Sequence, residues 1–244
     1  MATEIVTADV QYPGEGVTLR AHLARPKAEG RHPAVIVIQE WWGLNDHIKE
    51  VAGRFAREGY VGVAPDLYSR AGHKVTKDPN EAGQLMMGLD DTLALKDFDA
   101  TVAYLQQQVF VNGQRIGVVG FCMGGTYTTL LAAHNKAITA ASAFYGQIVY
   151  DQTSKAKPVS PLDAAKRITC PYLYIYGEAD GWITMDHVGQ LKKVLASHPK
   201  AEVKTYPNAP HAFFNDTRAD VYRPEAAKDA WDRTLKLFAQ HLRG

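Results

Sequence analysis

Short apolar runs recur along the chain and predict strands. Runs of this kind are typical of strands buried on both faces of a parallel sheet. They occupy residues 34–39, 60–68, 115–121, 138–146 and 172–177. Two further segments alternate apolar and polar residues, as half-buried strands do. These segments are residues 17–26, which could pair with residues 5–10, and residues 201–206.

The stretches between the runs predict helices. Their apolar residues recur at the spacing of one helix face, and capping residues mark several of their ends. They are residues 43–60, 81–108, 123–134, 186–197 and 224–242. Polar, turn-rich or irregular segments at residues 69–80 and 147–169 predict loops.

Strands that alternate with helices indicate consecutive βαβ units. We therefore expect a single α/β domain over residues 1–244, with a mostly parallel sheet of about eight strands and helices on both faces. The active site of such a sheet lies at the carboxyl ends of its strands. Four residues able to carry chemistry follow predicted strands directly or closely: Glu40, Cys122, Asp180 and His211.

Composition excludes several classes of partner. Among 244 residues, 46% are hydrophobic and the net charge is +1, so no basic field for nucleic acid is expected. No apolar run approaches the roughly 18–20 residues that cross a membrane. The N-terminal residues do not resemble a signal peptide, and two cysteines do not make a disulfide framework. These features predict a cytoplasmic protein, a monomer or weak homodimer, whose partner is a small molecule.

The residues around Cys122 match a nucleophile elbow. Residues 120–124 read G-x-C-x-G, which is the G-x-S-x-G turn with cysteine in place of serine. The helix that follows points its N-terminus at the cysteine, which favours a thiolate and a developing oxyanion. The backbone N–H of Met123 is therefore a candidate oxyanion donor. The alternative is a tight turn that holds an inert buried thiol.

Two later residues complete a candidate constellation. His211 lies after the last predicted strand, where a base is needed, and Asp180 follows the preceding strand, where it could orient the histidine. The chain order of nucleophile, acid and histidine is that of the α/β-hydrolases. Taken singly, His211 and Asp180 could each have a purely structural role. The histidine could be solvated, and an aspartate after a strand often caps a helix, although Asp186 is the more natural cap here.

At these positions the sequence resembles the dienelactone hydrolases (carboxymethylenebutenolidases) of the α/β-hydrolase superfamily. The similarity covers nearly the whole chain. Its most specific segments are residues 39–43 (QEWWG), 64–70 (APDLYSR), 120–125 (GFCMGG), 177–180 (GEAD) and 210–213 (PHAF).

The resemblance implies roles for individual residues. Cys122, His211 and Asp180 match the family's triad. Glu40 matches a glutamate that contacts the resting thiol and takes its proton when substrate binds, and the Trp41 N–H would be the second oxyanion donor. Arg70 matches an arginine that binds the substrate carboxylate.

The sequence departs from the family pattern at one position. A second substrate-binding arginine is expected four residues beyond the histidine, where this chain has Asn215. Carboxylated lactones would then bind more weakly, or another ester would be preferred. Arg218 lies nearby in the sequence as a possible substitute.

The function predicted is hydrolysis of ester or lactone bonds by Cys122, of the dienelactone hydrolase type. Trp42, Tyr145 and Phe213 are expected to line an apolar substrate pocket. No cofactor and no metal are expected, since the chain has neither metal-ligand spacing nor a phosphate-binding glycine loop. One alternative is a short-chain carboxylesterase for uncharged esters. Another is a redox or binding protein in which Cys170 pairs with Cys122.

Overall fold

The computed structural model describes residues 3–243, and its strands form one eight-stranded sheet. The strands are β1 (Ile5–Gly14), β2 (Val17–Pro26), β3 (His32–Ile38), β4 (Val61–Pro65), β5 (Val111–Phe121), β6 (Ile138–Phe144), β7 (Tyr172–Gly177) and β8 (Ala201–Tyr206). Their order across the sheet is β1-β2-β4-β3-β5-β6-β7-β8. β2 pairs antiparallel with β1 and β4, and the remaining pairs are parallel.

The apolar runs become the central strands, as predicted. Ala34 through Ile38 in β3 have no exposed surface, because helices cover both faces of the sheet there. The edge strand β1 is mostly exposed. The α/β fold with a mostly parallel sheet is confirmed.

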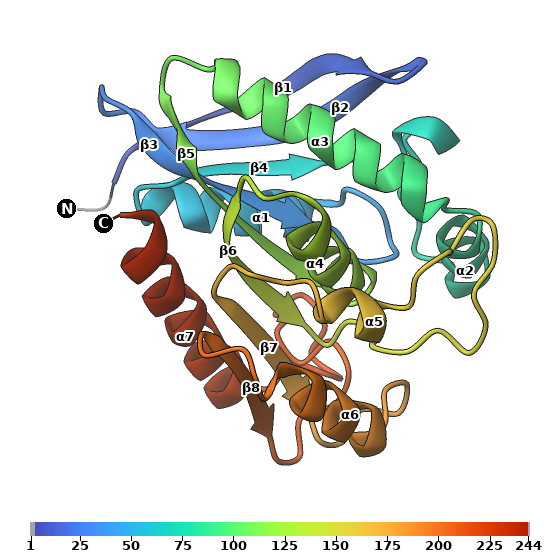
Figure 1. Ribbon diagram of the computed structural model, residues 1–244. Coiled ribbons are helices and arrows are strands. Elements are labelled where there is room, and N and C mark those ends of the chain that lie inside the picture. The colour runs from blue at the N-terminus through green and yellow to red at the C-terminus, as the bar shows by residue number, and fades with distance from the viewer. Residues whose placement is uncertain (1–2, 244) are drawn as a thin grey trace.

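The described chain also forms seven α-helices and one 3-10 turn, which connect the strands except for α7, the last element. They are α1 (Asp46–Arg57), η1 (Ser69–Ala71), α2 (Pro79–Met87), α3 (Asp91–Gln107), α4 (Met123–His134), α5 (Pro161–Ala165), α6 (Met185–Leu195) and α7 (Pro224–Leu242). Phe55 of α1 contacts Trp231 and Phe238 of α7, so these two helices share one face of the sheet. Figure 1 shows α3 and α4 on the near side, where Phe98 packs against Tyr127.

Two predicted segments differ in the structure. The stretch at 81–108 is not one helix. α2 ends at Met87, with Gly88 as its C-cap, and Asp90 caps α3 by accepting hydrogen bonds from the N–H groups of Thr92 and Leu93. This side-chain cap competes with a continuous helix. The segment at 147–169, expected to be irregular, contains the short helix α5.

A third difference concerns the cap of α6. Thr184, rather than Asp186, caps this helix by accepting from the N–H of His187. Asp186 instead lies within the first turn, where a carboxylate also stabilises the helix dipole.

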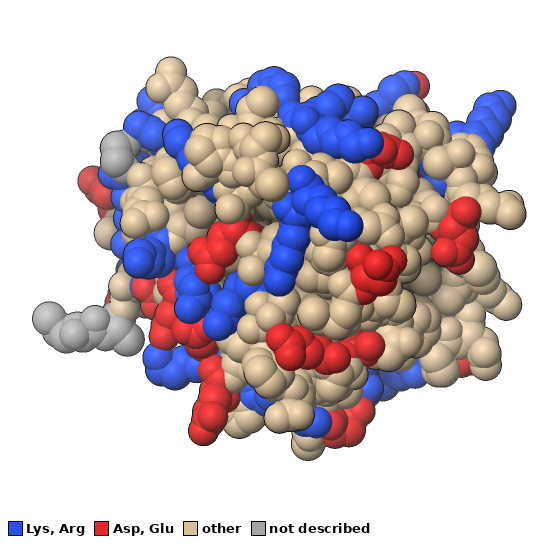
Figure 2. All heavy atoms as spheres, turned by 60° about the horizontal axis from the view of Figure 1, so that its bottom comes forward, with Lys and Arg blue, Asp and Glu red and all other residues tan. Residues whose placement is uncertain are grey.

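No helix of residues 3–243 combines the length and apolar character needed to cross a membrane. On the face shown in Figure 2, basic and acidic side chains are intermixed, and neither sign forms a continuous field.

Candidate active site

Cys122 lies in a strained turn between β5 and α4. Its backbone has φ 55° and ψ −119°, a conformation that non-glycine residues rarely adopt. A Cβ at Gly120 would lie 2.1 Å from the Gly124 oxygen, and one at Gly124 would lie 2.3 Å from the Ile38 oxygen. The two glycines are therefore required for β5, α4 and the end of β3 to approach so closely. The turn leaves the cysteine partly exposed at the carboxyl end of the sheet.

The loops after β7 and β8 bring Asp180 and His211 together. The N–H of Ala179 donates to the carbonyl of Ala209, and Gly177 lets that carbonyl approach, since a Cβ there would be 2.3 Å from it. The Asp180 side chain is fully buried, and its Oδ2 lies 2.7 Å from Nδ1 of His211. Its Oδ1 accepts from two loop N–H groups, which fixes the carboxylate.

His211 is in turn placed against Cys122. Burial lowers the pKa of His211, but interactions with Cys122 and the hydrogen bond with Asp180 outweigh burial and raise that pKa to about 10. The environment therefore favours the imidazolium form of His211. The three residues predicted from their chain order form one connected series.

Two backbone N–H groups face the same end of the sheet without internal partners. Trp41 follows β3 and Met123 opens α4. In the described part of the chain, neither N–H donates to another protein group. Both N–H groups are therefore available to donate to a bound group at this end of the sheet.

Glu40 is buried beside this series and is held by Asn215. Nδ2 of Asn215 donates to Oε2 of Glu40 over 2.8 Å, and both residues are 2% exposed. The oxygen of the Asn215 amide accepts from the N–H and hydroxyl of Thr217, which fixes the amide orientation. Burial raises the pKa of Glu40, opposed by the hydrogen bond from Asn215.

The structure thus gives Asn215 a partner that the sequence did not reveal. From the sequence, Asn215 marks only the absence of a substrate-binding arginine. In the structure, its amide is committed to Glu40 and Thr217. Among residues 3–243, no hydrogen bond joins Glu40 to Cys122, the contact that the family resemblance implied.

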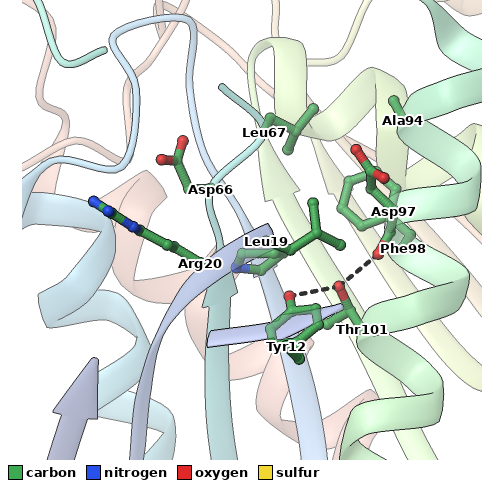
Figure 3. A pocket seen from close by; sticks show the side chains of 10 residues that line it. Tyr12, Leu19, Arg20, Asp66, Leu67, Ala94, Asp97, Phe98 and Thr101 are labelled. Atoms are coloured by element: carbon green, nitrogen blue, oxygen red, sulfur yellow. Dashed lines mark hydrogen bonds between the residues drawn. The ribbon is translucent and has the colours of Figure 1, made fainter. Parts of the chain in front are cut away.

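Arg70 does not join the other site residues in this structure. Its guanidinium pairs with Asp97 at 2.7 and 2.8 Å and also donates to the carbonyl of Glu15. Asp97 borders a cavity of about 10 Å³ between β1, β2 and α3 (Figure 3), which is the size of about one water molecule. Arg218 is likewise paired, with Asp220 at 2.8 Å.

Aromatic side chains surround the partly exposed pair of Cys122 and His211. Trp41 makes edge contacts with Trp42 and with Trp182, and Trp182 lies 6.2 Å from His211 between ring centroids. Trp182 is 70% exposed, although tryptophan is highly buried on average in folded proteins. It was not singled out from the sequence as a substrate contact. The signal available was its position two residues after Asp180.

Tyr145 and Phe213 are placed differently from Trp41 and Trp42. Both have no exposed surface, and the Tyr145 ring packs on His211 at 5.1 Å and on Phe213 at 5.6 Å. In this structure they support the histidine from within the core and do not form an open pocket wall.

Cys170 is a free cysteine remote from Cys122 in the sheet. It precedes the first residue of β7, whereas Cys122 follows the last residue of β5, and the two strands are parallel to β6 between them. Burial raises the pKa of Cys170 to about 11, which disfavours its thiolate. No group of three metal-ligating side chains occurs within residues 3–243.

A parallel sheet with a strained cysteine after β5, and with an acid and a histidine after the last two strands, defines the α/β-hydrolase class. The sequence model of the dienelactone hydrolase family matches residues 19–242. The chain belongs to this family, and with it to the hydrolases of ester and lactone bonds.

Relatives and solved structures agree with this assignment. A Bradyrhizobium protein named "Probable 2-oxo-3-(5-oxofuran-2-ylidene)propanoate lactonase" is 40% identical, over 100% of this chain and 98% of its own. A "Putative carboxymethylenebutenolidase" of Escherichia coli K12 is 37% identical over 97% and 88%. A crystal structure of a "Putative Dienelactone Hydrolase" from Klebsiella pneumoniae has 37% identity and a TM-score of 0.91, covering 98% of this chain and all of that one.

Proposed function

We propose that Cys122 is the nucleophile of this hydrolase, with His211 as its acid–base partner and Asp180 as the orienting carboxylate. The observation that carries the proposal is the connected series of these three side chains at a strained strand-to-helix turn. Strain of this kind persists where the surrounding structure holds a reactive group in place. A buried structural thiol would need neither a histidine partner nor the glycines that shape the turn.

The arrangement supports a two-step reaction. The thiolate attacks the carbonyl carbon, and the N–H groups of Trp41 and Met123 stabilise the oxyanion. The C–O bond then breaks, the imidazolium of His211 gives its proton to the leaving oxygen, and a thioester remains on Cys122. Water attacks the thioester, gives a proton to His211 and releases the acid and the thiolate. In a lactone the leaving oxygen stays attached, so one ring-opened acid is formed.

For the substrate, we propose an unsaturated lactone or a small ester that is recognised mainly by apolar contact. The Bradyrhizobium relative is named for a lactone with an unsaturated ring. The indole ring of Trp182 lies beside His211 and contacts that of Trp41, and the two indoles offer flat apolar surfaces to such a ring.

The second candidate substrate is an uncharged ester, because the arginines that could bind a carboxylate are absent or already paired. A substrate carboxylate would be expected to bind an arginine fork. Asn215 replaces one such arginine and is bonded to Glu40, while Arg70 and Arg218 are paired with Asp97 and Asp220. Releasing a paired guanidinium would cost part of the binding energy gained.

A matched pair of substrates tests both the activity and the preference. We expect the protein to hydrolyse p-nitrophenyl butyrate with a higher kcat/KM than p-nitrophenyl hemisuccinate, by about tenfold, because the carboxylate would be desolvated without a free guanidinium. The measurement is initial rate against substrate concentration. If the protein hydrolyses neither of the two esters nor dienelactone, the proposed function is contradicted. A tenfold preference for the hemisuccinate would contradict only the uncharged substrate.

We propose that Glu40 accepts the proton of the Cys122 thiol when substrate binds, which generates the thiolate that attacks. Because burial raises its pKa, it is a stronger base than an exposed glutamate. Only the ionised form accepts a proton, so kcat should rise with pH as Glu40 ionises. Glu40→Gln is expected to remove this acid limb and to lower kcat about 100-fold. The matched control is Glu50→Gln, a surface residue of α1 paired with Arg57. An unchanged acid limb in Glu40→Gln would refute the role.

A further inference from the structure

Tyr68 touches both residues whose N–H groups form the proposed oxyanion hole. Its hydroxyl donates to the backbone carbonyl of Trp41 over 2.8 Å and lies 3.6 Å from Sδ of Met123. Trp41 follows β3, whereas Met123 begins α4, so the two belong to separate elements. The tyrosine has no exposed surface, so water cannot readily replace it in these contacts.

A second set of contacts fixes where Tyr68 points. Oδ1 of Asp66 accepts from the Tyr68 N–H at 2.9 Å, and Oδ2 lies 2.7 Å from Nδ1 of His73. The Tyr68 carbonyl accepts from the N–H groups of Ala71 and His73. The turn after β4 is thereby closed around a buried carboxylate, and the tyrosine ring has little freedom to move.

We propose that Tyr68 is a positioning residue of the oxyanion hole, which sets the separation of the Trp41 and Met123 N–H groups. The inference rests on the proposed function. Oxyanion donors act only when they are held about 2.7–3.1 Å from the position the oxygen will take. Removal of the tyrosine hydroxyl leaves the Trp41 carbonyl without its buried donor and frees the chain after β3 to shift.

Tyr68→Phe keeps the ring and removes only the hydroxyl. We expect kcat for p-nitrophenyl butyrate to fall about tenfold, with KM changed less than twofold, because the loss is confined to the transition state. This is less than the roughly 100-fold cost of deleting an oxyanion donor outright. Affinity for a trifluoromethyl ketone, whose adduct with Cys122 carries an oxyanion, should fall by the same factor as kcat.

Alkylation separates this role from a merely structural one. Iodoacetamide reacts with the Cys122 sulfur without forming an oxyanion, so its rate in Tyr68→Phe should stay within twofold of the parent protein. The matched control is Tyr172→Phe, which removes an equally buried hydroxyl, bonded to Thr129 at 2.7 Å and placed at the start of β7. This control should leave kcat and ketone affinity unchanged.

Several outcomes would overturn the inference. They are a kcat within twofold of the parent, a ketone affinity that does not follow kcat, or an alkylation rate that falls in parallel with kcat. If Tyr68→Phe does not fold, Met123→Leu removes the sulfur contact but keeps the N–H, and the same correlation of kcat with ketone affinity is required. If the parent protein forms no ketone adduct on Cys122, the proposed function fails. If the parent protein forms the adduct and Tyr68→Phe binds the ketone with the same affinity, only the role of Tyr68 fails.

Discussion

Cys122→Ala is expected to abolish ester hydrolysis, with kcat/KM reduced by about 10⁴- to 10⁶-fold. The reaction proposed here forms a covalent bond to the Cys122 sulfur, and the remaining His211, Asp180 and N–H groups can only assist direct attack by water. The measurement is kcat/KM for p-nitrophenyl butyrate at neutral pH. Alanine fits the site because it is smaller than cysteine, although the positive φ of 55° stays strained for any L-residue.

The chain offers a matched control in its other cysteine. Cys170 is 8% exposed and precedes β7, at the opposite end of the sheet from Cys122. Cys170→Ala should leave kcat/KM within twofold. Mass mapping during turnover should place the acyl group on the peptide that contains Cys122. A Cys122→Ala protein that keeps a tenth of the parent activity would exclude Cys122 as the nucleophile, and loss of activity in Cys170→Ala would revive a role for a thiol pair.

Asp180→Asn is expected to lower kcat about 10⁴-fold while the fold is preserved. Both oxygens of Asp180 are used, Oδ1 by two loop N–H groups and Oδ2 by His211. An amide can keep the loop contacts only by turning its NH₂ toward His211, which then holds the wrong tautomer. Loss of the carboxylate also removes one of the interactions that raise the pKa of His211 to about 10.

Loss of the Asp180 carboxylate also determines the direction in which the reactivity of Cys122 changes. A lower pKa of His211 means less imidazolium at neutral pH and therefore a weaker partner for the thiolate. Alkylation of Cys122 by iodoacetamide at neutral pH should accordingly be slower in Asp180→Asn. The control is Asp186→Asn, which changes an aspartate in the first turn of α6 that is bonded only to Gln190 in the described chain. Equal alkylation rates in Asp180→Asn and the parent would contradict the proposed coupling.

Much of the fold could be predicted because it depends on local patterns. A run such as Ala34–Ile38 has no polar residue to place in water, so burial on both faces is its favourable state. Glycines at 120 and 124 around Cys122 allow a turn that side chains would block. The alternation of these signals along the chain was enough to predict the parallel sheet and the edge at which Cys122, Asp180 and His211 meet.

Errors arose where local signals compete. The helical periodicity across residues 81–108 continues through Gly88 to Asp90, but the aspartate side chain caps a new helix there. The cap of α6 was assigned to Asp186 for a similar reason, since Thr184 is an equally good capping residue. Propensity gives no preference among such candidates, because only the packing of each helix on the sheet decides where its first turn begins.

What the sequence by itself determined was the architecture, the residue types of the site and their order along the chain. Only the tertiary structure decided how those side chains pair. Asn215 meets Glu40 across 175 residues, and Arg70 meets Asp97 instead of reaching the site. The physical reason is that periodicity records which residues are buried, whereas a hydrogen bond depends on which neighbours the folded chain places within about 3 Å.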